Sequence, residues 1–261
     1  MNNLEAAAIE RFTLNVTLPL LYEQGEKSYL WGTGTLFSML DRYFVVTASH
    51  LFNSSFTFEN LGFPTNPKNG SLYTFGKMQC YRTDSEIFDI AVIEVQQKES
   101  IERLKDGWQF LNLNNIAAPT SNGNFLLAGY PSSLSKEENG WLKGTLITAY
   151  SKRMTEVPIE ASKPIHPELD LFFNYDDTAT TLYGKKLETS ELPGTSGASV
   201  WQIDNETGLG IWSPELAIKV VGVQSSYLRN KYFRAKNWLA VAKAFSNIDD
   251  DLAVHLEEVL Q

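Results

Sequence analysis

The sequence predicts an antiparallel all-β protein that ends in an α-helix, and two patterns support this fold class. Short segments rich in Val, Thr, Phe, Tyr and Leu recur along the chain between turn-forming residues, as strands do. Convincing helical periodicity occurs only near the C-terminal end. Many short strands with one late helix favour antiparallel sheets and a terminal helix.

The predicted strands lie in both halves of the chain. In the first half they cover residues 12–21, 29–39, 43–48 and 87–95. In the second half they cover residues 124–130, 141–150, 169–175, 199–203 and 217–225. Two further stretches, residues 53–71 and 157–167, have the Asn, Ser and Pro content of surface loops.

The last segment, residues 248–260, is predicted to form an amphipathic helix. Its apolar face carries Ile248, Leu252, Leu256, Val259 and Leu260. Aspartates at 249–251 lie where a helix start favours negative charge. We expect this helix either to pack on the second half or to offer a surface to a partner. Shorter helices are predicted over 4–12 and 238–245.

A turn-forming stretch without periodicity, residues 117–123, divides the chain into halves of similar strand content. With 261 residues the chain can build one large domain or two small ones. We predict two domains, residues 1–120 and residues 121–261. If each half forms a β-barrel, groups from both halves meet in the cleft between the barrels.

Charge and cysteine content limit the partners and the compartment. The net charge of −9 argues against a nucleic-acid partner, because phosphate binding needs clustered Lys and Arg. The acidity fits either solubility or steering towards a basic substrate. The single cysteine, Cys80, cannot form an intrachain disulfide, which favours a reducing compartment. Because no glycine-rich turn surrounds Cys80, we expect an apolar filler and not a nucleophile.

The apolar segments are too short to suggest a membrane span. None reaches the roughly 18 residues that a spanning helix needs. Residues 1–12 carry Glu5 and Glu10 where a secretory signal would have a basic and then an apolar run. We therefore predict a cytoplasmic protein that does not bind membranes.

Three segments carry the residue types of a serine hydrolase. His50 closes the strand-like run 43–48, Asp89 opens the apolar run 90–95, and Ser196 lies in a glycine-flanked turn. A serine hydroxyl becomes a nucleophile when a histidine takes its proton and a carboxylate orients that histidine. The sequence predicts Ser196, His50 and Asp89 in these three roles.

Other residues compete for two of the roles. His166 lies between prolines and His255 faces away from the apolar side of the last helix, so we expect both to be solvated. Asp84 and Glu86 lie close to Asp89 in the sequence. Asp89 is favoured because the following buried strand would shelter it, whereas Asp84 lies in a polar turn.

The glycines at 194 and 197 permit a tight turn that aims backbone N–H groups at one point. Acyl transfer requires such donors where the oxyanion develops. We predict the N–H groups of Gly194 and Ser196 as the oxyanion hole.

These segments resemble the chymotrypsin/trypsin-like serine peptidases. Residues 47–50 resemble the family's T-A-A-H, residues 89–92 its D-I-A-L, and residues 195–197 its D-S-G. Residues 32–37 resemble a glycine-rich strand of bacterial members, residues 129–131 the entry to the second barrel, and residues 221–225 the substrate-binding strand. The resemblance spans about 14–238 and implies two β-barrels with the active site between them.

The resemblance also implies an activity and partners. It points to a serine endopeptidase that needs no metal or organic cofactor and acts on a protein or peptide. The family's digestive members have a carboxylate before the serine that pairs with a newly cleaved N-terminus, whereas this chain has Thr195. We therefore expect an enzyme that is competent as made or switched by a protein activator.

The substrate pocket follows from the same resemblance. It places the pocket floor at Ser190, which would suit a small or apolar residue. A slip of one position would place Thr189 or Glu191 there, and Glu191 would favour Lys or Arg. Ser225, Ser226 and Tyr227 would border the pocket, with Tyr227 narrowing it unless the alignment slips there.

Two alternatives to a peptidase remain open. One is a protease-shaped binding protein without catalysis, which an intact set of Ser, His and Asp disfavours. The other is an esterase or amidase that uses the same site on small acyl substrates.

Overall fold

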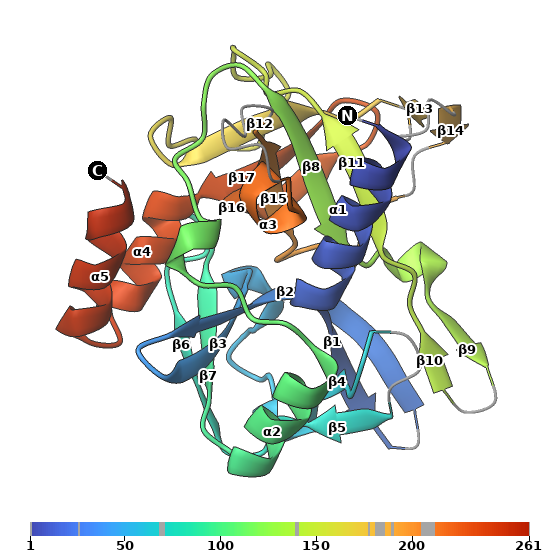
Figure 1. Ribbon diagram of the computed structural model, residues 1–261, viewed down its shortest axis with the longest axis vertical. Coiled ribbons are helices and arrows are strands. Elements are labelled where there is room, and N and C mark those ends of the chain that lie inside the picture. Colours follow the sequence, from blue (N-terminus) through green and yellow to red (C-terminus); the bar gives the residue numbers. More distant parts are fainter. Residues whose placement is uncertain are drawn as a thin grey trace.

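The computed structural model describes residues 2–25, 27–67, 71–138, 141–176, 178–180, 186–188, 191–204 and 212–260. Two curled antiparallel sheets lie one above the other in Figure 1, with helices around them. This arrangement confirms the predicted all-β class and its double-barrel form. The strands of one sheet end before residue 96, and those of the other begin after residue 123.

The first sheet has seven strands in the order β5-β4-β1-β2-β3-β7-β6. Its strands are β1 (Thr17–Gln24), β2 (Lys27–Met39), β3 (Arg42–Thr47), β4 (Leu61–Pro64), β5 (Leu72–Thr74), β6 (Met78–Arg82) and β7 (Ala91–Val95). Alternate side chains such as Leu36, Val45 and Ile93 are fully buried inside its curve. The period of two along each strand therefore builds the first half of the core.

The second sheet has six strands in the order β11-β8-β15-β16-β17-β12. Its strands are β8 (Asn124–Gly129), β11 (Ile147–Ser151), β12 (Asp170–Asn174), β15 (Ser199–Ile203), β16 (Ile218–Leu228) and β17 (Tyr232–Asn237). Two small hairpins project from it: β9 (Lys136–Glu138) with β10 (Trp141–Lys143), and β13 (Thr178–Thr180) with β14 (Lys186–Glu188). Phe125, Phe173 and Phe233 fill the inside of this sheet.

Helices complete the fold. The α-helices are α1 (Asn3–Val16), α2 (Lys98–Gly107), α3 (Pro214–Ala217), α4 (Trp238–Ser246) and α5 (Asp250–Leu260). The short 3-10 helices are η1 (Ser49–Leu51), η2 (Phe58–Asn60), η3 (Leu113–Asn115) and η4 (Ser132–Leu134). Among the described helices, none has the length and apolar character to cross a membrane.

The N-terminal segment differs from the prediction of a strand over 12–21. Helix α1 is predicted correctly in kind, but it continues to Val16, and β1 begins only at Thr17. Its start is fixed by a capping box in which the side chain of Asn2 accepts from the N–H of Glu5 and the carboxylate of Glu5 accepts from the N–H of Asn2. Ile9, Phe12 and Val16 are buried at helical spacing, and this burial overrides their strand propensity.

The C-terminal helices are present as predicted, and α5 packs against α4. Its buried residues Leu252 and Leu256 join a core that contains side chains of both sheets, such as Phe44 on β3 and Val220 on β16. Arg42 on β3 also forms an ion pair with Asp249 at the start of α5.

Other boundaries also depart from the sequence prediction. Residues 53–71 contain η2 and β4 instead of loop alone, and the single strand predicted over 141–150 is divided into β10 and β11. Strands β6 and β17 and helix α2 were not predicted. Residues 157–167 form neither helix nor strand, as expected.

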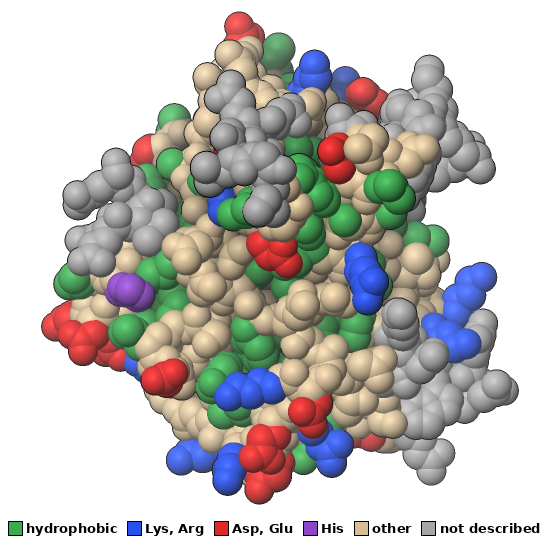
Figure 2. Space-filling model, viewed as in Figure 1, with side chains coloured by type: hydrophobic (Ala, Val, Ile, Leu, Met, Phe, Trp, Pro, Cys, Tyr) green, Lys and Arg blue, Asp and Glu red, His purple; other side chains and the backbone are tan. Residues whose placement is uncertain are grey.

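Charged side chains are dispersed over the face shown in Figure 2. Lys and Arg lie there in small groups among Asp and Glu, without a continuous basic surface.

Candidate functional site

His50, Asp89 and Ser196 lie side by side where the two sheets meet. The Nδ1 atom of His50 is 2.9 Å from Oδ2 of Asp89, and its Nε2 atom is 3.1 Å from Oγ of Ser196. The side chain of Asp89 is 6% exposed, whereas that of His50 is 39% exposed. The structure thus brings together a sheltered carboxylate, an accessible imidazole and a hydroxyl in one hydrogen-bonded chain.

The backbone around Asp89 holds its carboxylate towards His50. Asp89 has φ of 48°, a left-handed conformation that is strained for a residue with a side chain. Its N–H donates to Asp84 O at 2.9 Å, its carbonyl accepts from the N–H of Ser49 at 3.2 Å, and its Oδ1 accepts from the N–H of His50 at 2.9 Å. These three hydrogen bonds hold Asp89 in its strained conformation and fix its position next to η1.

The competing carboxylates face elsewhere. Asp84 is exposed, and its carboxylate accepts from the N–H groups of Glu86 and Ile87 in the turn before Asp89. Glu86 is exposed as well. Asp84 therefore shapes the turn, and only Asp89 of the three reaches His50.

The turn around Ser196 needs a glycine at 197. Its φ is 86°, and a Cβ atom there would lie 2.0 Å from Oγ1 of Thr47 and 2.2 Å from the carbonyl of Thr33. The N–H of Gly197 donates to Gln224 O on β16 at 2.9 Å, and the N–H of Thr33 on β2 donates to Ser196 O at 2.9 Å. The turn around Ser196 is thus bonded to both sheets, and the space at position 197 admits no side chain.

The peptide between Pro193 and Gly194 is oriented by Ser132. The carbonyl of Pro193 accepts from the N–H of Ser132 at 2.7 Å and from its hydroxyl at 2.9 Å. Because the C=O and N–H of a trans peptide point in opposite directions, the N–H of Gly194 points away from Ser132. Within the described residues, the N–H groups of Gly194 and Ser196 donate no hydrogen bond, so both are available to a ligand oxygen.

Thr195, which stands where the digestive peptidases have a carboxylate, is held by local bonds. It is fully buried, and its hydroxyl and N–H both donate to Leu192 O, at 2.7 and 2.9 Å. This anchor carries no charge and requires no ion pair with a distant amino group.

The structure describes only some of the predicted substrate-binding residues, and these differ in burial. Ser190 and Thr189 lie outside the described residues. Glu191 is half-exposed and bonded to Arg229 at 2.7 Å, so it lacks the burial that a pocket floor requires. Ser225 and Ser226 are partly buried on β16, where a bulge after Gln224 displaces Ser225 from regular pairing.

Tyr227 reaches from β16 to the nucleophile loop. Its pKa is raised, mainly by burial and also by the nearby charge of Glu191, although a hydrogen bond from the backbone of Leu192 acts in the opposite direction. Tyr227 is partly buried on β16, and its role in narrowing a pocket stays a prediction.

The sequence did not single out three residues that position this site. The hydroxyl of Thr33 accepts from the N–H of Tyr130 at 3.1 Å and donates to Gly194 O at 2.8 Å. Ser132 orients the Pro193 peptide, and Lys236 donates to Ile87 O, two residues before Asp89, at 2.6 Å. Thr33 lies in the glycine-rich segment noted above, but nothing local marks the other two, because their partners are distant in sequence.

Cys80 does not take part. Burial raises the pKa of its thiol to about 12, so the thiol stays protonated at neutral pH and is a poor nucleophile. This agrees with the apolar role expected for it.

Comparison with known proteins gives structural matches only. No protein-family model matches the sequence, and no curated protein matches it. The fold is similar to that of a serine endoprotease from Yersinia pestis, with a TM-score of 0.54, 14% identity, and coverage of 95% of this chain and 66% of the other. It is also similar to an inactivated protease paralogue of the scabies mite, with a TM-score of 0.54, 15% identity, and coverage of 91% and 96%.

A third match, from work on the Sesbania mosaic virus VPg protein, has a TM-score of 0.49, 14% identity and 87% coverage of each chain, which is too distant to carry an argument. At these identities the likeness concerns the fold and not the activity. The chain has the double-barrel fold of trypsin-like serine proteases, a fold that active and inactivated proteins share.

Proposed function

We propose that the protein is a serine endopeptidase. The observation that carries this proposal is the chain of hydrogen bonds from Asp89 through His50 to Ser196, with distances of 2.9 and 3.1 Å. A protein without catalysis would gain nothing from the strained conformation of Asp89 and the tight packing at Gly197, which place Asp89 and Ser196 against His50. These features support an active enzyme over a protease-shaped binding protein.

In this proposal His50 and Ser196 carry out acyl transfer. The Oγ atom of Ser196 attacks the scissile carbonyl carbon while its proton passes to Nε2 of His50, and Asp89 stabilises the imidazolium that forms. His50 then gives that proton to the leaving amine as the C–N bond breaks. Water attacks the acyl-enzyme with His50 as the base, which releases the carboxylic acid and restores Ser196.

The N–H groups of Gly194 and Ser196 serve as the oxyanion hole. Their lack of partners within the described structure leaves them free to donate to the negative oxygen of the tetrahedral intermediate. Loss of one such donor typically costs about 3–4 kcal/mol of transition-state stabilisation. Because Ser132 and Thr195 orient this turn without a charged partner, the proposed enzyme does not need activation by cleavage of its N-terminus.

The remaining parts of the proposal concern setting and partners. We propose a polypeptide substrate whose backbone pairs with Ser225, Ser226 and Tyr227, with Ser190 at the pocket floor. The single cysteine supports a reducing compartment such as the cytoplasm. The two domains are proposed to divide near residue 120, which falls between the two sheets, and a protein activator remains a possible regulator.

Labelling with a fluorophosphonate probe tests the central claim, because the probe reacts only with an activated serine. We expect stoichiometric labelling of the unmodified protein, no labelling of Ser196→Ala, and a rate at least about 1,000-fold lower for His50→Ala. Ser133→Ala, which changes an exposed serine nearby, is the matched control and should label normally.

Each result separates the hypotheses. An unlabelled native protein that is folded by circular dichroism would contradict a triad assembled in the free protein, and would leave either the binding protein or an enzyme that needs its activator. Labelling without cleavage of any polypeptide, but with turnover of small esters, would favour the esterase or amidase.

A further inference from the structure

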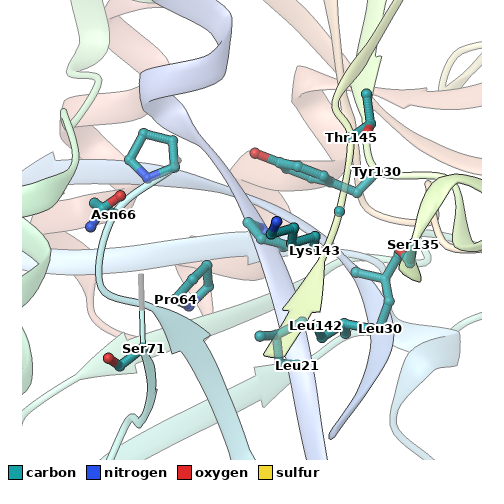
Figure 3. Close-up of a pocket in the computed structure, with 13 residues that line it drawn as sticks. Leu21, Leu30, Pro64, Asn66, Ser71, Tyr130, Ser135, Leu142, Lys143 and Thr145 are labelled. Carbon is teal, nitrogen blue, oxygen red and sulfur yellow. The ribbon is translucent and has the colours of Figure 1, made fainter. Parts of the chain in front are cut away.

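A pocket of about 420 Å³ lies between the two halves of the chain, beside the candidate site. Its walls come from β1, β2, the segment after β4 and the segment around β10 (Figure 3). Leu21, Leu30 and Leu142 gather on one side of the space in that view, and Ser71 and Pro64 lie on another. The pocket has the volume for a large side chain or for two small ones.

Two lining residues connect the pocket to the proposed oxyanion hole. A Cβ atom on Gly194 would lie 3.0 Å from Cδ2 of Leu30 and 2.8 Å from the carbonyl oxygen of Tyr130. Leu30 and Tyr130 therefore border both the pocket and the glycine whose N–H is proposed to bind the oxyanion. The pocket is therefore next to the proposed oxyanion hole.

The position of β16 shows which part of a substrate would enter. Gln224 on β16 bonds to Gly197, at one end of the nucleophile turn, whereas the pocket borders Gly194 at the other end. If the acyl part of the substrate pairs with β16, the part beyond the scissile bond extends past Gly194. The pocket therefore faces the portion that leaves with the amine.

The residues that line the pocket favour an apolar side chain of the substrate over a basic one. Leu21, Leu30, Leu142 and three prolines, at 19, 64 and 67, present apolar surface. Lys143 is the one charged side chain among the thirteen described lining residues, and Asn66, Ser71, Ser135 and Thr145 add polar groups. None of the thirteen carries a carboxylate, so a Lys or Arg side chain would find no ion pair and would meet the like charge of Lys143. The hydroxyl of Tyr130 is buried and, among the described residues, has no hydrogen-bond partner. Transfer of an apolar group from water into such a lining is favourable.

We propose that this pocket binds a bulky apolar side chain of the substrate on the leaving side of the scissile bond. The inference rests on the proposed peptidase function and adds to it a preference for Phe, Leu or Met beyond the cleavage point. It makes the pocket a specificity site built from both halves of the chain.

Acyl transfer to added amines tests the pocket without knowledge of the natural substrate. The enzyme is first acylated on Ser196 by p-nitrophenyl acetate, and water and a peptide amide then compete for the acyl group. The amine nitrogen attacks the acyl carbon, Ser196 leaves, and His50 carries the proton from the amine to Ser196. The ratio of acylated peptide to acetate reports how well each peptide amide binds on the leaving side.

We expect Phe-Ala-amide and Leu-Ala-amide, or their Ala-Phe and Ala-Leu isomers, to exceed Gly-Gly-amide by about tenfold or more in this ratio. Ser71→Trp would fill the pocket from its rim, away from Gly194, and should reduce the ratio for the apolar peptides to the Gly-Gly value. Ser121→Trp places the same side chain on an exposed turn outside the pocket and should leave the preference intact.

The outcomes distinguish this inference from the proposed function. Equal ratios for all the peptides, or a preference that survives in Ser71→Trp, would overturn the pocket inference while acylation itself upholds the hydrolase. Failure of the ester and of the fluorophosphonate probe to react would overturn the function, and the inference would fall with it.

Discussion

At the scale of single residues, the turn from Pro193 to Ser196 is held by hydrogen bonds between neutral groups and not by paired charges. Ser132 uses both its N–H and its hydroxyl on the carbonyl of Pro193, and Thr195 uses both of its donors on the carbonyl of Leu192. Neutral bonds of this kind do not titrate between pH 5 and 9. We therefore expect the oxyanion turn to keep its geometry across that range.

Ser132→Ala tests the side-chain part of this arrangement. It removes the hydroxyl bond to Pro193 O but keeps the backbone bond, so the peptide becomes less firmly oriented while the fold is retained. A single hydrogen bond is worth about 0.5–1.5 kcal/mol net, which corresponds to a roughly two- to tenfold slower reaction. The second-order rate constant of fluorophosphonate labelling measures this effect.

Ser133→Ala is the matched control for that variant, because Ser133 is the exposed neighbour on the same short helix. Its labelling rate should equal that of the native protein. A native rate for Ser132→Ala as well would contradict the role assigned to Ser132.

At the scale of elements, helix α1 fixes how the N-terminal segment meets the second sheet. Phe12 makes an edge contact with Trp201 on β15, with ring centroids 5.9 Å apart, and both side chains belong to the core between the sheets. The helix packs against α3 and leads directly into β1 of the first sheet (Figure 1). It thereby connects the core of the second sheet to the start of the first sheet.

Phe12→Ala should lower the free energy of unfolding by about 3–5 kcal/mol, because truncation of a buried phenylalanine leaves a cavity. Urea denaturation followed by tryptophan fluorescence measures the change. Leu4→Ala, on an exposed position of the same helix, should change the stability by less than about 0.5 kcal/mol. Equal effects of the two variants would show that α1 does not contribute to the core.

At the scale of the whole molecule, a buried ionic cluster links the second sheet to the loop that carries Asp89. Lys236 on β17 is 2% exposed and lies 2.7 Å from Oδ1 of the fully buried Asp170 on β12, which also pairs with Arg234. The ammonium of Lys236 also donates a hydrogen bond to the carbonyl of Ile87, in the first half of the chain. The cluster therefore spans the boundary between the halves, next to the loop that carries Asp89.

This cluster predicts a pH-dependent stability. Burial opposes the ionisation of Asp170, but hydrogen bonds from Arg234 and Lys236 outweigh it and hold the pKa of this carboxyl below its ordinary value of 3.8. The unfolded chain then takes up a proton at higher pH than the folded protein does. The stabilisation from ionised Asp170 is complete above about pH 5 and is lost as the pH falls through the lowered pKa.

Asp170→Asn should therefore cost about 3–5 kcal/mol at pH 7, since it leaves buried cations without their partner. The difference from the native protein in urea denaturation should shrink at pH 3. Asp106→Asn, at an exposed position of α2, should differ little from the native protein at either pH. A difference for Asp170→Asn that stays constant with pH would contradict the lowered pKa.

Segments with a local pattern were predictable, whereas those defined by distant partners were not. Strand β3 has the apolar composition of a strand, and glycines mark both ends of the turn from Gly194 to Gly197. Helix α4 begins at the residue that the helical periodicity predicted. Strand β6 was missed because its partly buried residues show little alternation. The end of α1 was misplaced because Phe12 and Val16 suit a strand as well as a helix, and only contact with Trp201 decides between them.

The sequence by itself determined the class of fold, the order of His50, Asp89 and Ser196, and the glycines that the nucleophile turn requires, because these depend on local conformational preference and residue chemistry. Only the tertiary structure decided that Asp89 and not Asp84 reaches His50, that Ser132 orients the peptide before Gly194, and that α5 rests beside α4. Each of these depends on groups far apart in the chain, which local preferences cannot bring together. Their positions follow from the packing of the two sheets against a shared core.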